Sequence, residues 1–274
     1  MNNDARSFLA ALLNEPSPSG YEGPSRRIWC NAMKKVADEV KVDVHGNSIA
    51  TLNPGGTPRV MLAGHIDELG FQICHIEKNG MLRFRTIGGH DLKTIPGRRV
   101  FIYTESGPIL AVIGQKPIHL QSDKTRAIPV KMSDLWMDAG FETRAKAEKV
   151  IQIGDAATYV EGYAEINKNI AIARGFDDRV GAFVVGETLR ALKRTKSFKA
   201  QISAVATVQE EIGMRGAKTS AFGLDPDVGI AVDVAWATDN PGGEAKEVGE
   251  VKLGKGPVLS RGPNMNPALF SMLK

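Results

Sequence analysis

Apolar and polar residues follow two different periods along this chain. Phe8, Leu9, Leu12 and Leu13 recur at helical spacing, and a second helix is expected from near Pro24. Farther along, residues 60–63, 202–208 and 228–232 form nearly uninterrupted apolar runs, which are typical of strands buried on both faces of a sheet. Helices and buried strands in this order predict an α/β fold.

Residues 70–163 show a different pattern, in which short alternating segments are separated by Gly and Pro turns. Such spacing predicts a small β-barrel or sandwich. Because the α/β pattern resumes afterwards, we expect residues 1–69 and 164–274 to form one domain and residues 70–163 to be inserted into it. The polar stretch 116–131 is expected to be a loop. In the tail, short strands are expected around Val251 and Val258.

Composition narrows the function classes. The 274 residues are 42% hydrophobic, which is enough for a sizeable core, and the formal charge of +4 comes without a basic run that would indicate nucleic-acid binding. Cys30 and Cys74 are the only cysteines, too few for a disulfide scaffold, so buried free thiols are expected. No apolar run approaches the roughly 20 residues that span a bilayer. A soluble cytoplasmic protein is therefore expected.

Polar residues follow each of the three buried runs. His65 and Asp67 follow the first, Glu210 and Glu211 follow the second, and Asp233 follows the third. Since the carboxyl ends of strands in open α/β sheets are where sites assemble, these side chains could converge on one crevice. An imidazole with several carboxylates suits a zinc or cobalt site. The alternative is that the acids merely favour the positive ends of the following helices.

Four motifs occur at these positions in sequence order: GHIDELG (64–70), GFDDRVGAF (175–183), QEEIGMRGA (209–217) and AVDV (231–234). Together with PSPSGYEG (16–23) and HGN (45–47), they resemble metallopeptidase family 42, which includes glutamyl, deblocking and TET aminopeptidases and endoglucanase-M-like proteins. The resemblance implies a zinc-peptidase-like (phosphorylase/hydrolase-like) catalytic domain with a mixed sheet. It also implies an inserted PDZ-like β-barrel that mediates assembly into homo-oligomers, from dimers to dodecamers.

The resemblance also implies roles for single residues in the hydrolysis of short peptides from their N-terminus. Two divalent metal ions per subunit, zinc or cobalt, are expected. Asp177 resembles the carboxylate that bridges them, His65 and Asp233 the ligands of one ion, and Glu211 a ligand of the other. Glu210 resembles the general base, and Asp67 the acid that orients the ligand histidine. A cis peptide bond is expected between Asp177 and Asp178. An isolated Asp at this position would be read as a helix N-cap.

Two alternatives remain beside the aminopeptidase. Some relatives carry an endoglucanase label, although glycoside hydrolysis normally needs two carboxylates flanking the bond at a defined separation. The other alternative is a non-catalytic assembly protein on the same fold.

No histidine follows His119, whereas the resemblance implies a further C-terminal segment with a histidine that completes the second metal site. The chain as written is therefore expected to bind at most one ion tightly, through His65, Asp177 and Asp233, and to have little activity.

Overall fold

The three apolar runs form neighbouring parallel strands in a five-stranded sheet. The computed structural model describes residues 1–123, 128–195 and 197–274. Its main sheet has the order β1-β2-β12-β3-β13, with bounds β1 (Glu39–Val42), β2 (Ser48–Leu52), β12 (Gln201–Thr207), β3 (Arg59–His65) and β13 (Val228–Ala231). β12, β3 and β13 run parallel, while β2 pairs antiparallel with both β1 and β12. The sheet is therefore mixed.

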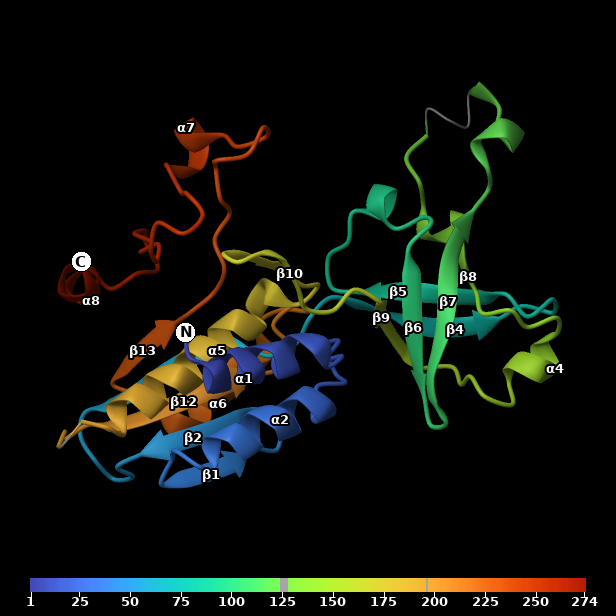
Figure 1. Ribbon diagram of the computed structural model, residues 1–274. Coiled ribbons are helices and arrows are strands. Elements are labelled where there is room, and N and C mark those ends of the chain that lie inside the picture. The colour runs from blue at the N-terminus through green and yellow to red at the C-terminus, as the bar shows by residue number, and fades with distance from the viewer. Residues whose placement is uncertain (124–127, 196) are drawn as a thin grey trace. The chain divides into compact units, whose positions relative to one another are not determined.

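Helices cover both faces of this sheet (Figure 1). Residues of α1 (Asn3–Asn14), α2 (Gly23–Met33) and α5 (Phe176–Leu192) pack in one core with Ala50, Leu52, Ala204 and Ala206. On the opposite face, Ile49, Met61 and Val205 pack with residues of α6 (Arg215–Leu224). In β2 and β12 successive residues point to opposite faces and are nearly all buried, which explains the continuous apolar run of β12. The expectation of burial on both faces is wrong for β13, the last strand in the sheet order, whose residues are half-buried or exposed.

Residues 70–159 contain a closed barrel with the strand order β4-β5-β8-β7-β6-β9. The bounds are β4 (Gly70–Ile76), β5 (Leu82–Ile87), β6 (Arg99–Thr104), β7 (Gly107–Gln115), β8 (Leu135–Asp138) and β9 (Ala156–Tyr159). Its interior is a separate apolar cluster that includes Phe71, Ile73 and Ile102. Short helices η1 (Leu92–Thr94), η3 (Met132–Asp134) and α4 (Arg144–Ala147) lie between the strands. Of the two interpretations left open, the barrel is correct and the sandwich is not; the domain boundaries and the PDZ-like character stay predictions.

Several elements differ from expectation. β8 and the hairpin β10 (Ala164–Asn167) and β11 (Ile170–Ile172) were not expected from the sequence. The expected loop 116–131 includes the 3-10 helix η2 (Ile118–Leu120), and its residues 124–127 lie outside the described part of the chain. Both cysteines are free; Cys30 is buried, but Cys74 is only half-buried.

Residues 234–274 form a second unit. It contains α7 (Ala245–Val248) and α8 (Pro267–Leu273). The strands expected around Val251 and Val258 are wrong, because the described residues there are irregular. Val251 instead closes a local loop with Thr238, whose backbone N–H donates to the Val251 carbonyl at 2.7 Å and whose hydroxyl accepts from the Val251 N–H at 3.0 Å.

Candidate active site

The carboxyl ends of three parallel strands bring the polar residues to one edge of the sheet. β3 ends at His65, whose register partner is Thr207 at the end of β12. On the other side of β3, Ala231 of β13 pairs with Ala63, so Asp233 lies two residues beyond that pair, as His65 does. Parallel pairing therefore places the residues after all three strands side by side, as the sequence pattern predicts.

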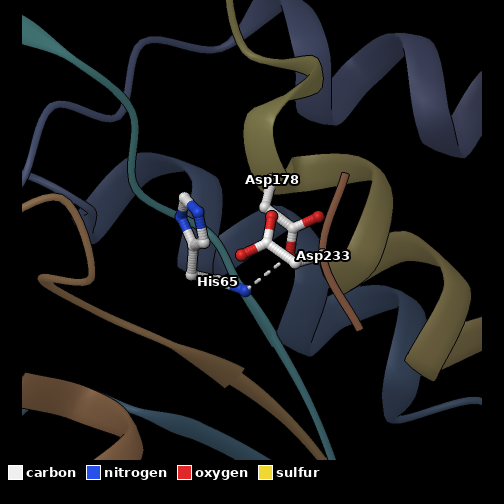
Figure 2. Close-up of side chains that lie close together, drawn as sticks. All are labelled: His65, Asp178 and Asp233. Atoms are coloured by element: carbon white, nitrogen blue, oxygen red, sulfur yellow. Dashed lines mark hydrogen bonds between the residues drawn. The ribbon is translucent and has the colours of Figure 1, made fainter. Parts of the chain in front are cut away.

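Two groups of three side chains, which have His65 in common, are each compact enough to bind a cation. In His65, Asp177 and Glu211, and again in His65, Asp178 and Asp233, one ligand atom of each residue lies within 4.8 Å of the others. Figure 2 shows the second group, in which the Asp178 and Asp233 carboxylates lie beside each other next to His65. From the sequence, Asp178 was expected to follow a cis peptide bond or to belong to a helix N-cap, but not to be a member of the cluster. No pattern distinguishes the second acid from the first in GFDDRVGAF.

Asp178 also ties the start of α5 to the end of β3. One of its carboxylate oxygens accepts from the His65 backbone N–H and the other from the Gly181 N–H, both at 3.1 Å. The peptide bond between Asp177 and Asp178 is cis, as expected. Helix and strand meet here without a side chain between them: a Cβ on Gly64 would lie 2.3 Å from the carbonyl carbon of Gly181. The glycine in GHIDELG is therefore required by packing.

His65 is surrounded by carboxylates. Its Nε2 lies 3.1 Å from Asp177 Oδ1 and 3.8 Å from Glu210 Oε2, and its Nδ1 lies 3.4 Å from Asp67 Oδ1. Burial by itself lowers the pKa of His65, but the hydrogen bonds with Asp177 and Asp67 outweigh it and raise the pKa to about 11. The protein by itself therefore gathers more negative charge around this imidazole than one proton neutralises.

The neighbouring acids show the same excess of negative charge. Burial and the negative charge of Asp233 raise the pKa of Asp178 to about 8, although His65 opposes this. Burial and the negative charge of Asp177 raise the pKa of Glu211 to about 7. The pKa of Glu210 is also raised, first by burial. A divalent cation would supply the positive charge that this cluster lacks, and imidazole with carboxylate oxygens is a donor set that zinc accepts. The residues present therefore fit a metal site.

Asp67 is completely buried and is hydrogen-bonded to several groups around the cluster. It accepts from the Ser19 hydroxyl at 2.6 Å and from the backbone N–H groups of Glu210 and Glu211 at 3.0 and 3.2 Å. Burial alone would raise its pKa, but the hydrogen bond and positive charge of His65, with help from Ser19, lower it. These interactions therefore favour the ionised form of Asp67 beside the Nδ1 side of His65.

A buried ion cluster flanks the site. Glu68 Oε2 lies 2.6 Å from Arg179 Nη2 and 3.1 Å from Arg174 Nε. Arg179, fully buried, also donates to the carbonyl of Leu12 in the last turn of α1 and to that of Glu15 directly after the helix. Because Glu68 follows Asp67 and Arg174 and Arg179 bracket Asp177, the cluster joins both acid-bearing segments. Sequence reasoning missed these residues, since single Arg and Glu residues in a motif do not reveal whether they are buried.

Comparison with known families decides the class of the protein. The M42 glutamyl aminopeptidase family matches residues 46–274, well over half of the chain. The chain belongs to the M42 glutamyl aminopeptidase family. The resemblance to metallopeptidase family 42 and the prediction of an enzyme of the metallo-aminopeptidase class are thereby confirmed. Among the helices of the described residues, none is long and apolar enough to cross a membrane.

Individual M42 relatives cover most of the chain. The lysyl aminopeptidase of Pyrococcus furiosus is 37% identical over 265 residues, which make up 96% of this chain and 75% of that protein. The structure of a TET aminopeptidase from the marine sediment archaeon Thaumarchaeota archaeon SCGC AB-539-E09 matches with a TM-score of 0.87 and 33% identity, over 90% of this chain and 70% of that one.

A third relative is known as an assembly. The TET1 peptidase of Pyrococcus horikoshii, which can assemble into a tetrahedron or a large octahedral shell, matches with a TM-score of 0.76 and 32% identity. The match covers 84% of this chain and 68% of that one. At this identity the likeness extends to the mixed α/β fold and the family.

Proposed function

We propose that this M42 protein removes N-terminal residues from short peptides by metal-assisted hydrolysis, with Glu210 as the general base. The observation that carries the proposal is the position of Glu210. Its carboxylate lies 3.8 Å from His65 Nε2, yet it belongs to neither ligand group, whereas the adjacent Glu211 belongs to one. A carboxylate that borders a metal site without being a ligand can accept a proton from water and pass it to the leaving amine.

Two divalent ions, zinc or cobalt, are proposed for the two ligand groups. His65 and Asp233 would hold one ion, and Asp177 and Glu211 the other. The sharing of Asp177 between both ions, which the resemblance implies, stays a prediction, because it is Asp178 that lies in the group with His65 and Asp233. Because His65 Nδ1 faces Asp67, the imidazole offers Nε2 to a single ion. An ion beside Asp177 and Glu211 would then have only carboxylate oxygens from the described residues, so we expect it to be held more weakly, since zinc sites usually have at least three protein ligands. Bound ions would polarise the scissile carbonyl and lower the pKa of water.

The remaining groups orient the site. Asp67 beside Nδ1 directs the His65 Nε2 nitrogen outward, toward Asp177 and Glu210. An acid in this position raises the basicity of a ligand histidine and selects its tautomer. Glu210 must ionise to act as a base, and its raised pKa brings it nearer to neutral pH, where proton transfer is most efficient. In this proposal Asp67 orients the ligand His65, and Glu210 transfers the proton.

We further propose that the protein acts in the cytoplasm as a homo-oligomer of between two and twelve subunits, assembled through the insert 70–163. Support for assembly comes from the TET1 relative, which forms tetrahedral and octahedral particles. The insert folds as a closed barrel with a core of its own, which makes it suited to act as a separate assembly module.

The proposal is tested with a panel of lysyl, leucyl and glutamyl arylamides beside carboxymethylcellulose, before and after chelation. We expect hydrolysis of at least one arylamide, its loss on chelation and its recovery with zinc or cobalt. Hydrolysis of the polysaccharide alone, or arylamide hydrolysis that survives thorough chelation, would contradict the proposed function.

A further inference from the structure

The segment that carries Glu210 and Glu211 is held by side chains rather than by the sheet. Beyond Thr207, the last residue of β12, four consecutive backbone N–H groups donate to side-chain oxygens. Val208 donates to Asn47 Oδ1 at 3.1 Å, Gln209 to Glu22 Oε1 at 3.2 Å, and Glu210 and Glu211 to the two oxygens of Asp67 at 3.0 and 3.2 Å. Three side chains therefore hold the N–H groups of these residues, while the carbonyls of residues 208–210 accept from backbone N–H groups of residues 213–216.

Each of these three acceptors is buried and is itself fixed by other groups. Asn47, fully buried, donates from Nδ2 to Asp43 at 2.7 Å and to Thr219 at 2.9 Å. Glu22, only 7% exposed, also accepts from the Gly20 N–H at 2.8 Å with the same oxygen that receives Gln209. The acceptors come from three separate segments: the start of α2, the β1–β2 turn and the residues after β3. We call the three side chains Glu22, Asn47 and Asp67 together the frame of this segment.

The backbone explains why such a frame is needed. Gln209 has a φ of 55°, a left-handed conformation that a residue with a side chain adopts only at a cost. This turn takes the following amides out of the ladder of β12, and buried amides without partners are strongly destabilising. Carboxylate acceptors are the strong partners for such groups. The frame thus stabilises the left-handed turn at Gln209. This turn sets the direction in which the Glu210 and Glu211 side chains point.

We propose that Glu22 and Asn47 are positioning residues of the M42 reaction, which act through the backbone of residues 208–211 to aim Glu210 and Glu211. Neither residue belongs to a ligand group, so their effect passes through hydrogen bonds to the main chain. Asp67 has a second duty in the same frame, besides its place at His65. The proposal rests on the proposed function of Glu210 and Glu211.

The test compares Glu22→Ala with Glu22→Gln in the full chain. Alanine removes the acceptor, and displaced supporting groups of this kind typically cost 10- to 100-fold in activity, so we expect kcat on an arylamide to fall about 10- to 100-fold with KM changed less than about threefold. Glutamine keeps an oxygen that can accept from Gly20 and Gln209, and should restore most of kcat.

A matched control is Ser203→Ala, farther back on the same strand. Ser203 is 2% exposed and its hydroxyl lies 3.1 Å from the Thr51 hydroxyl, so the variant loses a buried hydrogen bond without touching the frame. We expect its melting temperature to fall while kcat stays near the wild-type value. Equal losses of kcat in Ser203→Ala and Glu22→Ala, or a Glu22→Gln variant as slow as Glu22→Ala, would overturn the positioning role.

Hydrogen exchange supplies a readout that does not depend on the fold of a variant or on activity. In the wild-type chain, mass spectrometry should find slow exchange in a peptide covering residues 208–211, although it follows the strand. Exchange as fast as in an exposed loop would overturn the frame. If the wild-type enzyme lacks metal-dependent activity but this peptide is protected, the proposed function fails and the frame stands. If the wild type is active and the Glu22→Ala variant is equally active, the proposed function stands and the positioning role fails.

Discussion

At the scale of single residues, the main feature of the site is the crowding of several carboxylates around one histidine. The pKa of Asp178 rises to about 8 and that of Glu211 to about 7, both first because of burial, while nearby acids raise the pKa of His65 to about 11 despite its burial. All three pKa shifts favour the protonated form of the side chain. A cation would compete with those protons for the same oxygen and nitrogen atoms.

Metal binding should therefore release protons and strengthen as pH rises. In the protein by itself, Glu211 is mostly protonated below its pKa of about 7 and mostly ionised above it, whereas His65, with a pKa of about 11, keeps its proton throughout the neutral range. Each displaced proton changes affinity about tenfold per pH unit. Calorimetric titration with zinc in two buffers of different ionisation enthalpy measures the release. An affinity that is constant across neutral pH, with no proton release, would rule out this competition.

At the scale of elements, β3 and α5 form the pair that places the acids beside the histidine. Their backbones touch at Gly64 and Gly181. Gly64→Ala would put a methyl group 2.3 Å from the Gly181 carbonyl carbon, so the helix must shift, at a cost of about 1–3 kcal/mol in the free energy of unfolding.

Gly229→Ala is the matched control, since a Cβ there meets nothing within 4 Å although Gly229 lies on the neighbouring strand β13. Urea denaturation measures both variants. A similar change in both would mean that the close approach is unimportant.

The same elements show how far the sequence leads. The apolar runs and their polar ends predict the three parallel strands and the edge where they meet, because a strand covered on both faces is apolar at almost every position. β13 has the same apolar pattern although its residues are half-buried or exposed. β8 escapes detection, since only Leu135 and Met137 point inward in its four residues. The frame of Glu22, Asn47 and Asp67 could not be predicted either, because it depends on hydrogen bonds between segments up to 187 residues apart. The motifs PSPSGYEG and HGN contain two of these residues but do not reveal their partners.

At the scale of the whole molecule, the barrel exposes apolar side chains that a second copy could cover. Leu110 and Val112 of β7 are 51% and 41% exposed. If the insert mediates assembly, replacing both by Asp should lower the particle mass measured by light scattering. Val44→Asp, at an exposed turn outside the barrel, serves as the control and should leave the mass unchanged. An unaltered mass in the barrel variant would place the assembly surface elsewhere.

The central claim is that Glu210 is the base beside a metal site that it does not help to hold. The most direct test measures metal content by mass spectrometry together with arylamide turnover in Glu210→Gln and Glu211→Gln. We expect Glu210→Gln to keep its metal and lose about 10²- to 10⁴-fold in kcat, whereas Glu211→Gln should lose metal as well as activity. Near-normal turnover in Glu210→Gln, or loss of its metal to the same extent as in Glu211→Gln, would contradict the account.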